Sequence, residues 1–565
     1  MPQDNYDLVI VGAGMAGALC AWRLSQGANP PRILLLEEGD NGLDDAQRQA
    51  FVKTYMEAAV KGSTSPYTKL DSAKVILSPE SGSNPAVLNQ YFVEAGPDLY
   101  KSNYLRVLGG STWTWRGNTP RFIPSDFRLK SLYGVADDWP IGYDELEPFY
   151  CEAERQLGIA GNDDEAKEWE RLFGAYRSQP FPMPNIVPSY GDRLLMRAIN
   201  GLELDGKTVQ VMTLPQARNS QPYDGRKECE GYATCIPICP NAAKYDASVH
   251  LRRALDQQVE LRRRAVVTRL EVEPGGSKIS KVWFRDWSAP DQGEQSVTGR
   301  LVVLAANAIE SAKLWLLSGL GNRSGQVGGN LMDHLADEVT GLFPEPVYPF
   351  RGPQSNCCIE VFRDGAFRRS CGAFRMTVGA DGWGRKEHPF ATLDRLMWSA
   401  PDQRLVRFGR ELQQAIEARV TRMLRLSYST EQLPAKTNRV TLSDQKDALG
   451  IPRPKLQYAL DDYSKRALAY GQSVARRLFE HIPGATEIDP IQPTLGYNGA
   501  GHVMGTLRMG ANPDTSVVDS YGRSHEHPNL YILGASVFVT GSTANPTVTV
   551  AALSLRSAEA IWGEL

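Results

Sequence analysis

Three of the eight cysteines in this 565-residue chain lie within eleven positions, in the segment C-E-G-Y-A-T-C-I-P-I-C-P (229–240). An odd number of thiols cannot close into disulfides among themselves. Closely spaced thiolates with a proline after the last one are typical of loops that wrap an iron–sulfur cluster. A zinc site usually shows C-x2-C pairs or a nearby histidine, and this segment has neither. Cys229, Cys235 and Cys239 are therefore predicted to hold an iron–sulfur cluster, with zinc and the absence of a metal as alternatives.

A second chemical site is indicated near the N-terminus, in the stretch D-L-V-I-V-G-A-G-M-A-G. A β-branched run leads into three spaced glycines and a helix-like segment, which predicts a strand, a tight turn and a helix. Gly12 would allow the turn, Gly14 the approach of a pyrophosphate, and Gly17 the close packing of helix and strand. The next apolar run ends in Glu37, whose carboxylate could accept hydrogen bonds from a ribose; Glu38 is the alternative. FAD and NAD both fit this pattern.

The composition excludes several classes of protein. With 62 Lys and Arg against 65 Asp and Glu, the formal net charge is −3, so no nucleic-acid partner is expected. No apolar run reaches the ~18 residues of a membrane-spanning helix, and the N-terminus lacks the basic region and cleavage-like site of a secretory signal. Taken alone, the sequence predicts a protein made in the cytoplasm with reduced thiols, and long enough for two lobes.

Further motifs follow one another along the chain. They are Y-L-R-V-L-G-G-S-T-W-T-W-R-G, L-V-V-L-A-A-N-A-I-E-S-A-K-L-W, V-G-G-N-L-M-D-H, A-G-H-V-M-G-T-L-R-M-G and T-A-N-P-T-V-T. With the glycine fingerprint, they make the sequence resemble the glucose–methanol–choline (GMC) oxidoreductase family of FAD-dependent alcohol oxidases and dehydrogenases over nearly its whole length. Segments 137–161 and 215–226 and the cysteine trio further resemble the catalytic subunits of bacterial FAD-dependent sugar dehydrogenases of the glucose and fructose dehydrogenase type.

The resemblance implies an α/β fold with two lobes, each assembled from separated pieces of chain. One would be a doubly wound, Rossmann-like FAD-binding domain, and the other a substrate domain with an antiparallel sheet. The expected parts are an N-terminal FAD-binding part (1–130), an insertion with a cap and the cysteine loop (131–250), a middle FAD-binding part (251–340), the substrate-binding domain (341–495) and a C-terminal FAD-binding and catalytic segment (496–565).

The resemblance also assigns the catalytic residues. Oxidation of an alcohol needs a base for the hydroxyl proton and a flavin that accepts the hydride. Of the seven histidines, His502 matches the family's base, a role that suits imidazole because its reference pKa is about 6.5. Asn545 takes the place of the base's companion and could donate a hydrogen bond to the alcohol oxygen. His334, in N-L-M-D-H, is expected to make a structural hydrogen bond only.

Other cofactor contacts are implied by the same match. Beyond the fingerprint and Glu37, the residues expected to contact FAD are Gly109, Gly110, Ser111, Thr114, Val267 (or Val266), Gly534, Ala535, Asn545 and Thr547. In some relatives a histidine in the G-G-S/T-x-x-W segment tethers the flavin covalently. Thr114 stands at that position here, which predicts a dissociable FAD.

For the cysteine trio the resemblance implies a [3Fe–4S] cluster, with a [4Fe–4S] cluster that has one non-cysteine ligand as the near alternative. Related enzymes work as complexes, so a small chaperone-like subunit that is exported with the catalytic chain and a cytochrome c subunit are the implied partners. The chain would then act on the periplasmic side of the inner membrane and associate with the membrane only through its partners. Without them it would be cytoplasmic.

The leading functional prediction is FAD-dependent oxidation of a CH–OH group in a sugar or sugar derivative, with electrons leaving through the cluster to a cytochrome or a dye. One alternative is an O2-using pyranose oxidase or a glucoside 3-dehydrogenase of the same family. The other is a flavin and iron–sulfur module for electron transfer. Which sugar and which carbon react depends on hydrogen bonds arranged in space, and residue spacing does not reveal them.

Overall fold

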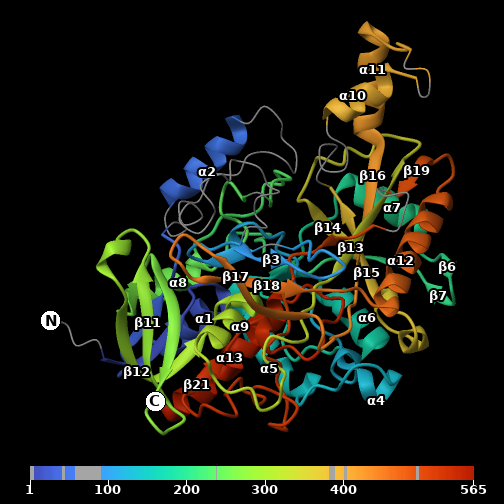
Figure 1. Ribbon diagram of the computed structural model, residues 1–565. Helices are drawn as coiled ribbons and strands as arrows, with labels where there is room; N and C mark the ends of the chain where they lie inside the picture. Colours follow the sequence, from blue (N-terminus) through green and yellow to red (C-terminus); the bar gives the residue numbers. More distant parts are fainter. Residues whose placement is uncertain are drawn as a thin grey trace.

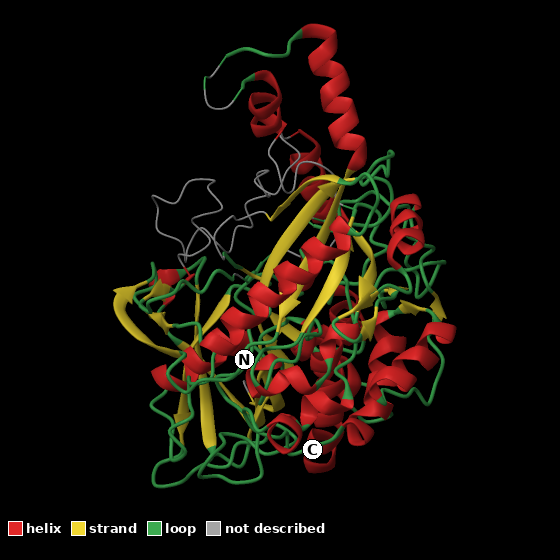
Figure 2. Ribbon diagram, turned by 90° about the vertical axis from the view of Figure 1, so that its right-hand side faces the viewer, coloured by secondary structure: helices red, strands yellow, loops and turns green. Residues whose placement is uncertain are grey.

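The computed structural model describes residues 5–40, 45–57, 91–102, 104–236, 238–380, 389–399, 402, 404–490 and 496–565. The chain forms two lobes, each built on its own seven-stranded β-sheet (Figures 1 and 2). The described chain begins with β1 and ends with α13, and both belong to the lobe that contains β11 and β12 (Figure 1). Within the described ranges, none of the helices has the length and apolar character needed to span a membrane.

The first lobe is organised around a parallel sheet. β1 (Asn5–Val11) lies between β12 (Gln295–Leu304) and β2 (Ile33–Leu36). β21 (Leu530–Ile532) extends the sheet beyond β12, and β9 (Glu260–Arg262) extends it beyond β2. All four residues of β2 and the last four of β1 are buried, which requires cover on both faces of the sheet. This is the pattern of a doubly wound α/β domain.

Helices and a small antiparallel meander complete this lobe. α1 (Met15–Leu24) packs against α8 (Ser248–Asp256) and α13 (Thr547–Glu564), and α13 packs against α5 (Tyr143–Leu157). The meander consists of β10 (Ala265–Val272) and β11 (Ile279–Asp286), which pairs with the start of β12, while α9 (Asn307–Leu317) follows β12. The last helix of the chain is therefore packed beside the first one.

The second lobe contains an antiparallel sheet in the order β19-β13-β16-β15-β14-β8, with β20 beside β13. Its strands are β8 (Val211–Thr213), β13 (Leu335–Leu342), β14 (Ser355–Ile359), β15 (Phe374–Gly379), β16 (Met423–Thr430), β19 (Thr486–Pro490) and β20 (Asn498–Gly499). α12 (Asp462–Glu480) packs on β13 and β16. Asp461 caps its N-terminus, because the Asp461 carboxylate accepts a hydrogen bond from the Ser464 N–H (2.6 Å).

Between β15 and β16 the chain leaves this sheet as a pair of helices, α10 (Pro389–Met397) and α11 (Gly409–Arg422). The pair stands clear of the two lobes in both views (Figures 1 and 2). Ion pairs from Arg395 (3.4 Å) and Arg419 to Glu487 of β19 fix its base.

Several smaller elements complete the described structure. They are the sheet of β17 (Arg439–Lys446), β18 (Pro452–Gln457) and β3 (Val93–Glu94), the pairs β4 (Ala160–Gly161) with β5 (Met183–Pro184) and β6 (Glu203–Leu204) with β7 (Lys207–Thr208), and the helices α2 (Asp45–Glu57), α4 (Leu129–Tyr133), α6 (Asp163–Phe173) and α7 (Tyr190–Ile199).

The predicted combination of a parallel, Rossmann-like sheet with a separate antiparallel sheet is confirmed. Each sheet draws strands from distant parts of the sequence, as the resemblance implied. β8 and β13 of the antiparallel sheet come from the segments 131–250 and 251–340. The five-part division of the chain into domains stays a prediction.

Candidate active site

The turn between β1 and α1 has the geometry that its glycines predict. Gly12 has a φ of +102°, and a side chain on Gly17 would place its Cβ 2.0 Å from the Gly12 carbonyl oxygen. A Cβ added to Gly14 would instead meet no atom within 4 Å. Gly12 and Gly17 therefore serve the turn and the helix packing, while Gly14 faces open space. The N-terminus of α1 beside it has no side-chain cap, so its N–H groups can bind an anion.

Glu37, just after β2, holds this turn in place. Its buried carboxylate accepts hydrogen bonds from the N–H groups of Ala13 (2.8 Å) and Gly39 (2.7 Å). Burial raises the pKa of Glu37, and these backbone N–H groups oppose the rise. The neighbouring Glu38 forms an ion pair with Arg106 (3.1 Å). Glu37 is therefore the carboxylate that lies against the turn, and its contact with a ribose stays a prediction.

Two further glycine segments meet the start of α1. The Gly109 N–H donates to the Ala13 carbonyl oxygen (3.0 Å), and a Cβ on Gly110 would lie 3.4 Å from the Gly14 Cα. Gly534 has a φ of +88° and lies against the first turn of the helix. The three segments converge on one glycine-lined space at the positive end of α1, which fits the pyrophosphate of a dinucleotide.

The other predicted cofactor residues occupy different surroundings. Val267 lies in β10, close to Ala265, whose N–H donates to the Glu37 carbonyl oxygen (2.9 Å). Thr547 is the first residue of α13. Ser111 is exposed, and its hydroxyl accepts a hydrogen bond from the Leu105 N–H (3.0 Å). Thr114 and Ala535 are half-buried. Their roles as FAD contacts stay predictions.

The two histidines of the site form a direct pair. The Nδ1 atoms of His502 and His334 are 2.8 Å apart, and the Nε2 of His334 is 2.9 Å from the Gly541 carbonyl oxygen. A carbonyl oxygen only accepts, so the His334 Nε2 carries a proton and its Nδ1 is the acceptor in the neutral ring. The Nδ1 of His502 must then donate to His334. This leaves the lone pair of the neutral His502 on Nε2.

Asn545 faces that lone pair. Its Nδ2 lies 3.1 Å from the His502 Nε2, and its Oδ1 accepts a hydrogen bond from the Arg375 Nη1 (3.0 Å). Because Arg375 can only donate, it fixes which end of the amide is the donor. Glu360 in turn holds the Arg375 guanidinium through two hydrogen bonds, of 2.9 Å and 2.6 Å. His502 and Asn545 remain partly exposed, so a hydroxyl placed against both could donate to Nε2 and accept from Nδ2.

The surroundings keep both imidazoles neutral. Burial, together with the charges of Arg375 and Arg116, holds the pKa of His502 well below its usual value. Burial also lowers the pKa of His334 to about 4. His502 is therefore an unprotonated base at neutral pH.

Asp333 holds the backbone of both histidines. Its Oδ1 accepts the N–H groups of His334 (2.7 Å) and His502 (2.9 Å), and its other oxygen accepts the Ser102 hydroxyl. Burial raises the pKa of Asp333 to about 6. The aspartate of the N-L-M-D-H box thus ties the chain before β13 to the chain that carries the base.

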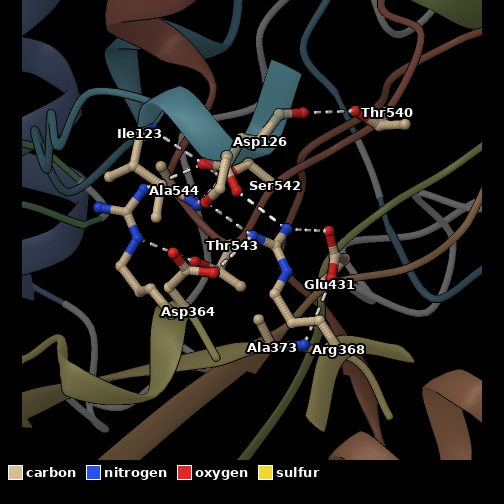
Figure 3. A network of polar contacts seen from close by, with 12 residues as sticks. Ile123, Asp126, Asp364, Arg368, Ala373, Glu431, Thr540, Ser542, Thr543 and Ala544 are labelled. Carbon is tan, nitrogen blue, oxygen red and sulfur yellow. Dashed lines mark hydrogen bonds and ion pairs between the residues drawn. The ribbon is translucent and has the colours of Figure 1, made fainter. Parts of the chain in front are cut away.

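A buried ionic network fixes the segment that carries Gly541 and Asn545 (Figure 3). Asp126 accepts the Ser542 hydroxyl (2.5 Å), and Arg368 joins Asp126 (3.0 Å) to Glu431 (2.6 Å). Each of these four side chains is at most 1% exposed. Loss of one charged partner would leave the other buried and unpaired, at a cost of about 3–5 kcal/mol. The network therefore resists movement of the segment.

Comparisons with known proteins agree with this architecture. Residues 209–336 and 434–554 match the two sequence models described as GMC oxidoreductase. The fructose dehydrogenase large subunit of Gluconobacter japonicus is 33% identical over 569 residues, which cover 99% of this chain and 98% of that protein. The chain belongs to the GMC oxidoreductase family.

Other relatives of this GMC oxidoreductase act on different alcohols or share only the fold. Paromamine 6'-oxidase of Streptomyces fradiae is 28% identical, over 99% of this chain and 92% of that protein. The crystal structure of pyridoxine 4-oxidase from Mesorbium loti superposes with a TM-score of 0.59 at 19% identity, over 98% of both chains. The family binds FAD and acts on the alcohol groups of sugars and related compounds, and the glycine-lined space is the part of this chain that fits the cofactor.

The cysteine trio of this GMC oxidoreductase lies among buried cations. The Arg218 Nη1 donates to the Cys235 Sγ (2.9 Å), and the Lys244 backbone N–H donates to the Cys239 Sγ (3.4 Å). Burial raises the pKa of the Cys235 thiol, but Arg218 and Lys244 outweigh it and bring that pKa below its usual value. Cys235 and Cys239 are buried, and Cys229 is partly exposed.

The thiols themselves do not form a ready metal site. In the part of the chain that the structure describes, no three His, Cys, Asp or Glu side chains are grouped so that they could hold a metal ion. The iron–sulfur cluster on Cys229, Cys235 and Cys239 therefore stays a prediction.

The sequence predicts that His502 and Asn545 act together, and the structure brings them together. The residues that orient them were not predicted. His334 was expected to have a structural hydrogen bond only, yet it contacts the base directly. Its position in a motif shared with Asp333 was a signal. Arg375 and Glu360 carried none, because the sequence does not show that β14 and β15 deliver them to Asn545.

The low pKa of His502 predicts the pH dependence of the reaction. The base is active when neutral, so kcat/KM with a good substrate should be flat through neutral pH and fall only well below pH 6.5. Steady-state kinetics with a dye acceptor measures this profile. Asp333, whose pKa is raised to about 6, could also contribute to the acid limb of the profile. The variant Asp333→Asn keeps an oxygen acceptor but does not titrate, so it removes this contribution. An acid limb at or above pH 6.5 in both proteins would contradict the assignment.

Proposed function

We propose that this protein is an FAD-dependent dehydrogenase that oxidises a CH–OH group of a sugar or sugar derivative and passes the electrons to a separate carrier. The observation that carries the proposal is the directed hydrogen-bond chain from Gly541 through His334 and His502 to Asn545. In the structure the Asn545 Nδ2–H donates to the His502 Nε2 lone pair (3.1 Å). A substrate hydroxyl that takes the place of this bond would accept from the amide and donate to the lone pair.

The chain's own residues account for the proton transfer. The substrate hydroxyl donates to the His502 Nε2, while the Asn545 Nδ2–H donates to the hydroxyl oxygen. Because burial and Arg375 disfavour an imidazolium, His502 takes up the proton only as negative charge develops on that oxygen. The Nδ1–H bond to His334 keeps the ring in place during the transfer. When bound, FAD would accept the hydride from the carbon that bears this hydroxyl.

The charge balance around the cysteines supports an iron–sulfur centre. Three buried cations surround the trio, Arg48, Arg218 and Lys244, and within the described residues Asp246 is the one carboxylate paired with them (2.5 Å, to Arg48). Unpaired buried charge is costly, so the site favours thiolates or a larger anion. A cluster with three cysteine thiolates carries net negative charge and is stabilised by N–H groups directed at its sulfurs. We therefore keep the proposal of a [3Fe–4S] cluster on Cys229, Cys235 and Cys239.

Next to these thiols the chain has an exposed surface that an electron-carrier protein could bind. Tyr232 lies within the cysteine loop and is 50% exposed, and Phe350 is 40% exposed. Their segments adjoin, since the Gly352 N–H donates to the Gly231 carbonyl oxygen (3.3 Å). Because the similar fructose dehydrogenase chain is named a large subunit, we propose that this chain also works with other subunits, among them a cytochrome c and a small co-exported subunit that would bring it to the periplasm.

The alternative within the family is an oxidase, which the similarity to paromamine 6'-oxidase favours. An oxidase passes electrons from the flavin to O2 and needs no cluster. The buried cations at the cysteines argue for the dehydrogenase.

A panel of sugars, glycosides and polyols with an artificial acceptor tests the proposal. We expect one sugar class to reduce the dye rapidly and little peroxide to form in air. His502→Ala should lower turnover by ~10²–10⁴-fold without changing the melting temperature, because the general base is lost. Unchanged sugar oxidation in that variant would exclude His502 as the catalytic base and would leave the alternative of a flavin and iron–sulfur module for electron transfer. Stoichiometric peroxide would favour the oxidase.

The attachment of FAD can be tested separately. Thr114 cannot form the histidyl–flavin bond of some relatives, so acid precipitation of the yellow protein should leave the colour in the supernatant. Colour that stays with the pellet would show a covalent flavin and would overturn this prediction.

The electron path predicts a selective defect for Cys239→Ser. The variant should lose iron, acid-labile sulfide and the electron paramagnetic resonance signal of a three-iron cluster. Sugar should still reduce its flavin in a stopped-flow experiment, while reduction of a protein acceptor should fall at least tenfold. Cys371→Ser is the matched control, because that half-buried thiol lies outside the loop. Equal iron in both variants and in the parent would exclude the cluster.

A further inference from the structure

The tip of the α10–α11 pair, defined here as Trp398 with residues 404–410, carries an unusual set of exposed side chains. Four of them are large and apolar: Trp398 (39% exposed), Leu405 (44%), Val406 (37%) and Phe408 (71%). Single exposed apolar residues are ordinary, but four on one short projecting tip indicate a contact surface.

Basic residues alternate with the apolar ones. Arg404, Arg407 and Arg410 are exposed, and no carboxylate of the described residues is paired with any of them. Residues 404–410 therefore carry three positive charges, flanked by the exposed carboxylates of Asp402 and Glu411, on a chain whose net charge is −3. A local positive surface of this kind is complementary to an anionic one.

The tip is an ordered structure. Trp398 and Leu405 lie opposite each other in a short antiparallel bridge. The Ser399 N–H donates to the Arg404 carbonyl oxygen (2.9 Å), and the Val406 N–H donates to the Met397 carbonyl oxygen (2.7 Å). The apolar side chains are thus presented by a fixed backbone, so their burial against a partner would cost little ordering of the chain.

From these features we propose that the tip inserts into the interface of an anionic lipid surface. Tryptophan and phenylalanine next to arginines are the residues that anchor peripheral proteins at the boundary between headgroups and acyl chains. A stable protein partner would need roughly 800 Å² on each side, more than the eight described residues of the tip supply. A lipid surface requires only that a few side chains enter it.

The position of the tip fits this role. The helices leave the sheet where β15 ends and β16 begins, at the pairing of Gly379 with Arg425. Arg375 and the pair Leu335–Thr430, next to the catalytic histidines, lie at the other end. The eight residues of β16 span about 23 Å at ~3.3 Å per residue. A protein held by its tip would keep its active site away from the lipid and open to soluble substrate.

Vesicle flotation of the FAD-loaded, full-length protein tests the proposal. It should float with phosphatidylcholine–phosphatidylglycerol vesicles at low salt, and about tenfold less with phosphatidylcholine alone. Leu405→Ser with Phe408→Ser should lower the partition coefficient for the anionic vesicles about tenfold or more, and so should glutamine at the three arginines. Val187→Ser is the matched control, because Val187 is 70% exposed and lies on another segment. Dye turnover should change by less than about twofold in every variant.

A second measurement separates lipid from protein contact. The fluorescence emission of Trp398 is obtained as the difference between the parent protein and Trp398→Phe. This emission should shift to shorter wavelength when the protein binds vesicles. Failure of the parent protein to float, or equal flotation of the tip variants, would overturn the proposal. The proposal would also be overturned if, without lipid, the Leu405→Ser, Phe408→Ser variant had a lower sedimentation coefficient than the parent protein. The tip would then be an interface between two copies of the chain. None of these outcomes depends on the iron–sulfur cluster or on the identity of the sugar.

Discussion

The positions of the protons on both catalytic imidazoles depend on one backbone carbonyl group, that of Gly541. Because this oxygen can only accept, it places the proton of His334 on Nε2 and thereby the proton of His502 on Nδ1. At the other end, Arg375 can only donate, and it orients the Asn545 amide. The chain is fixed at both ends by groups that do not titrate near neutral pH. The lone pair of the base is thus a consequence of geometry, and no carboxylate is needed beside His502 to create it.

Such a chain works only if its two ends keep their distance, and buried charge provides that rigidity. Three buried arginines lie on the catalytic side of the second lobe, and three carboxylates match them: Asp126, Glu360 and Glu431 with Arg363, Arg368 and Arg375. The cysteine loop has the opposite character. Among the described residues, only Arg48 of its three buried cations is paired with a carboxylate, that of Asp246, whereas Arg218 and Lys244 are not. The same fold therefore contains one region whose charges are complete and one whose charges call for a further anion.

Motifs that act through the backbone were the easiest to predict. Gly12, Gly14 and Gly17 each have a local reason that is visible in sequence, and the strand and helix around them formed as expected. The catalytic pair was predicted because His502 and Asn545 sit in motifs of a family that the chain resembles. The residues that support the pair were not predicted. Arg375 and Asp126 reach the C-terminal segment across 170 and 416 residues of sequence, and Glu360 acts only through Arg375. The α10–α11 pair was missed for the same reason: nothing in its sequence indicates that it leaves the sheet.

One side chain connects the two chemical regions. The Lys244 ammonium donates its three hydrogen bonds to the carbonyl oxygens of Trp113 (3.0 Å), Trp115 (2.6 Å) and Cys235 (2.9 Å). Trp113 and Trp115 belong to the segment whose glycines line the dinucleotide space, and Cys235 belongs to the thiol loop. All three donors are used, so neither segment can move away without leaving a buried charge unsatisfied. Lys244 therefore helps to fix the distance between the place where electrons would enter and the place where they would leave.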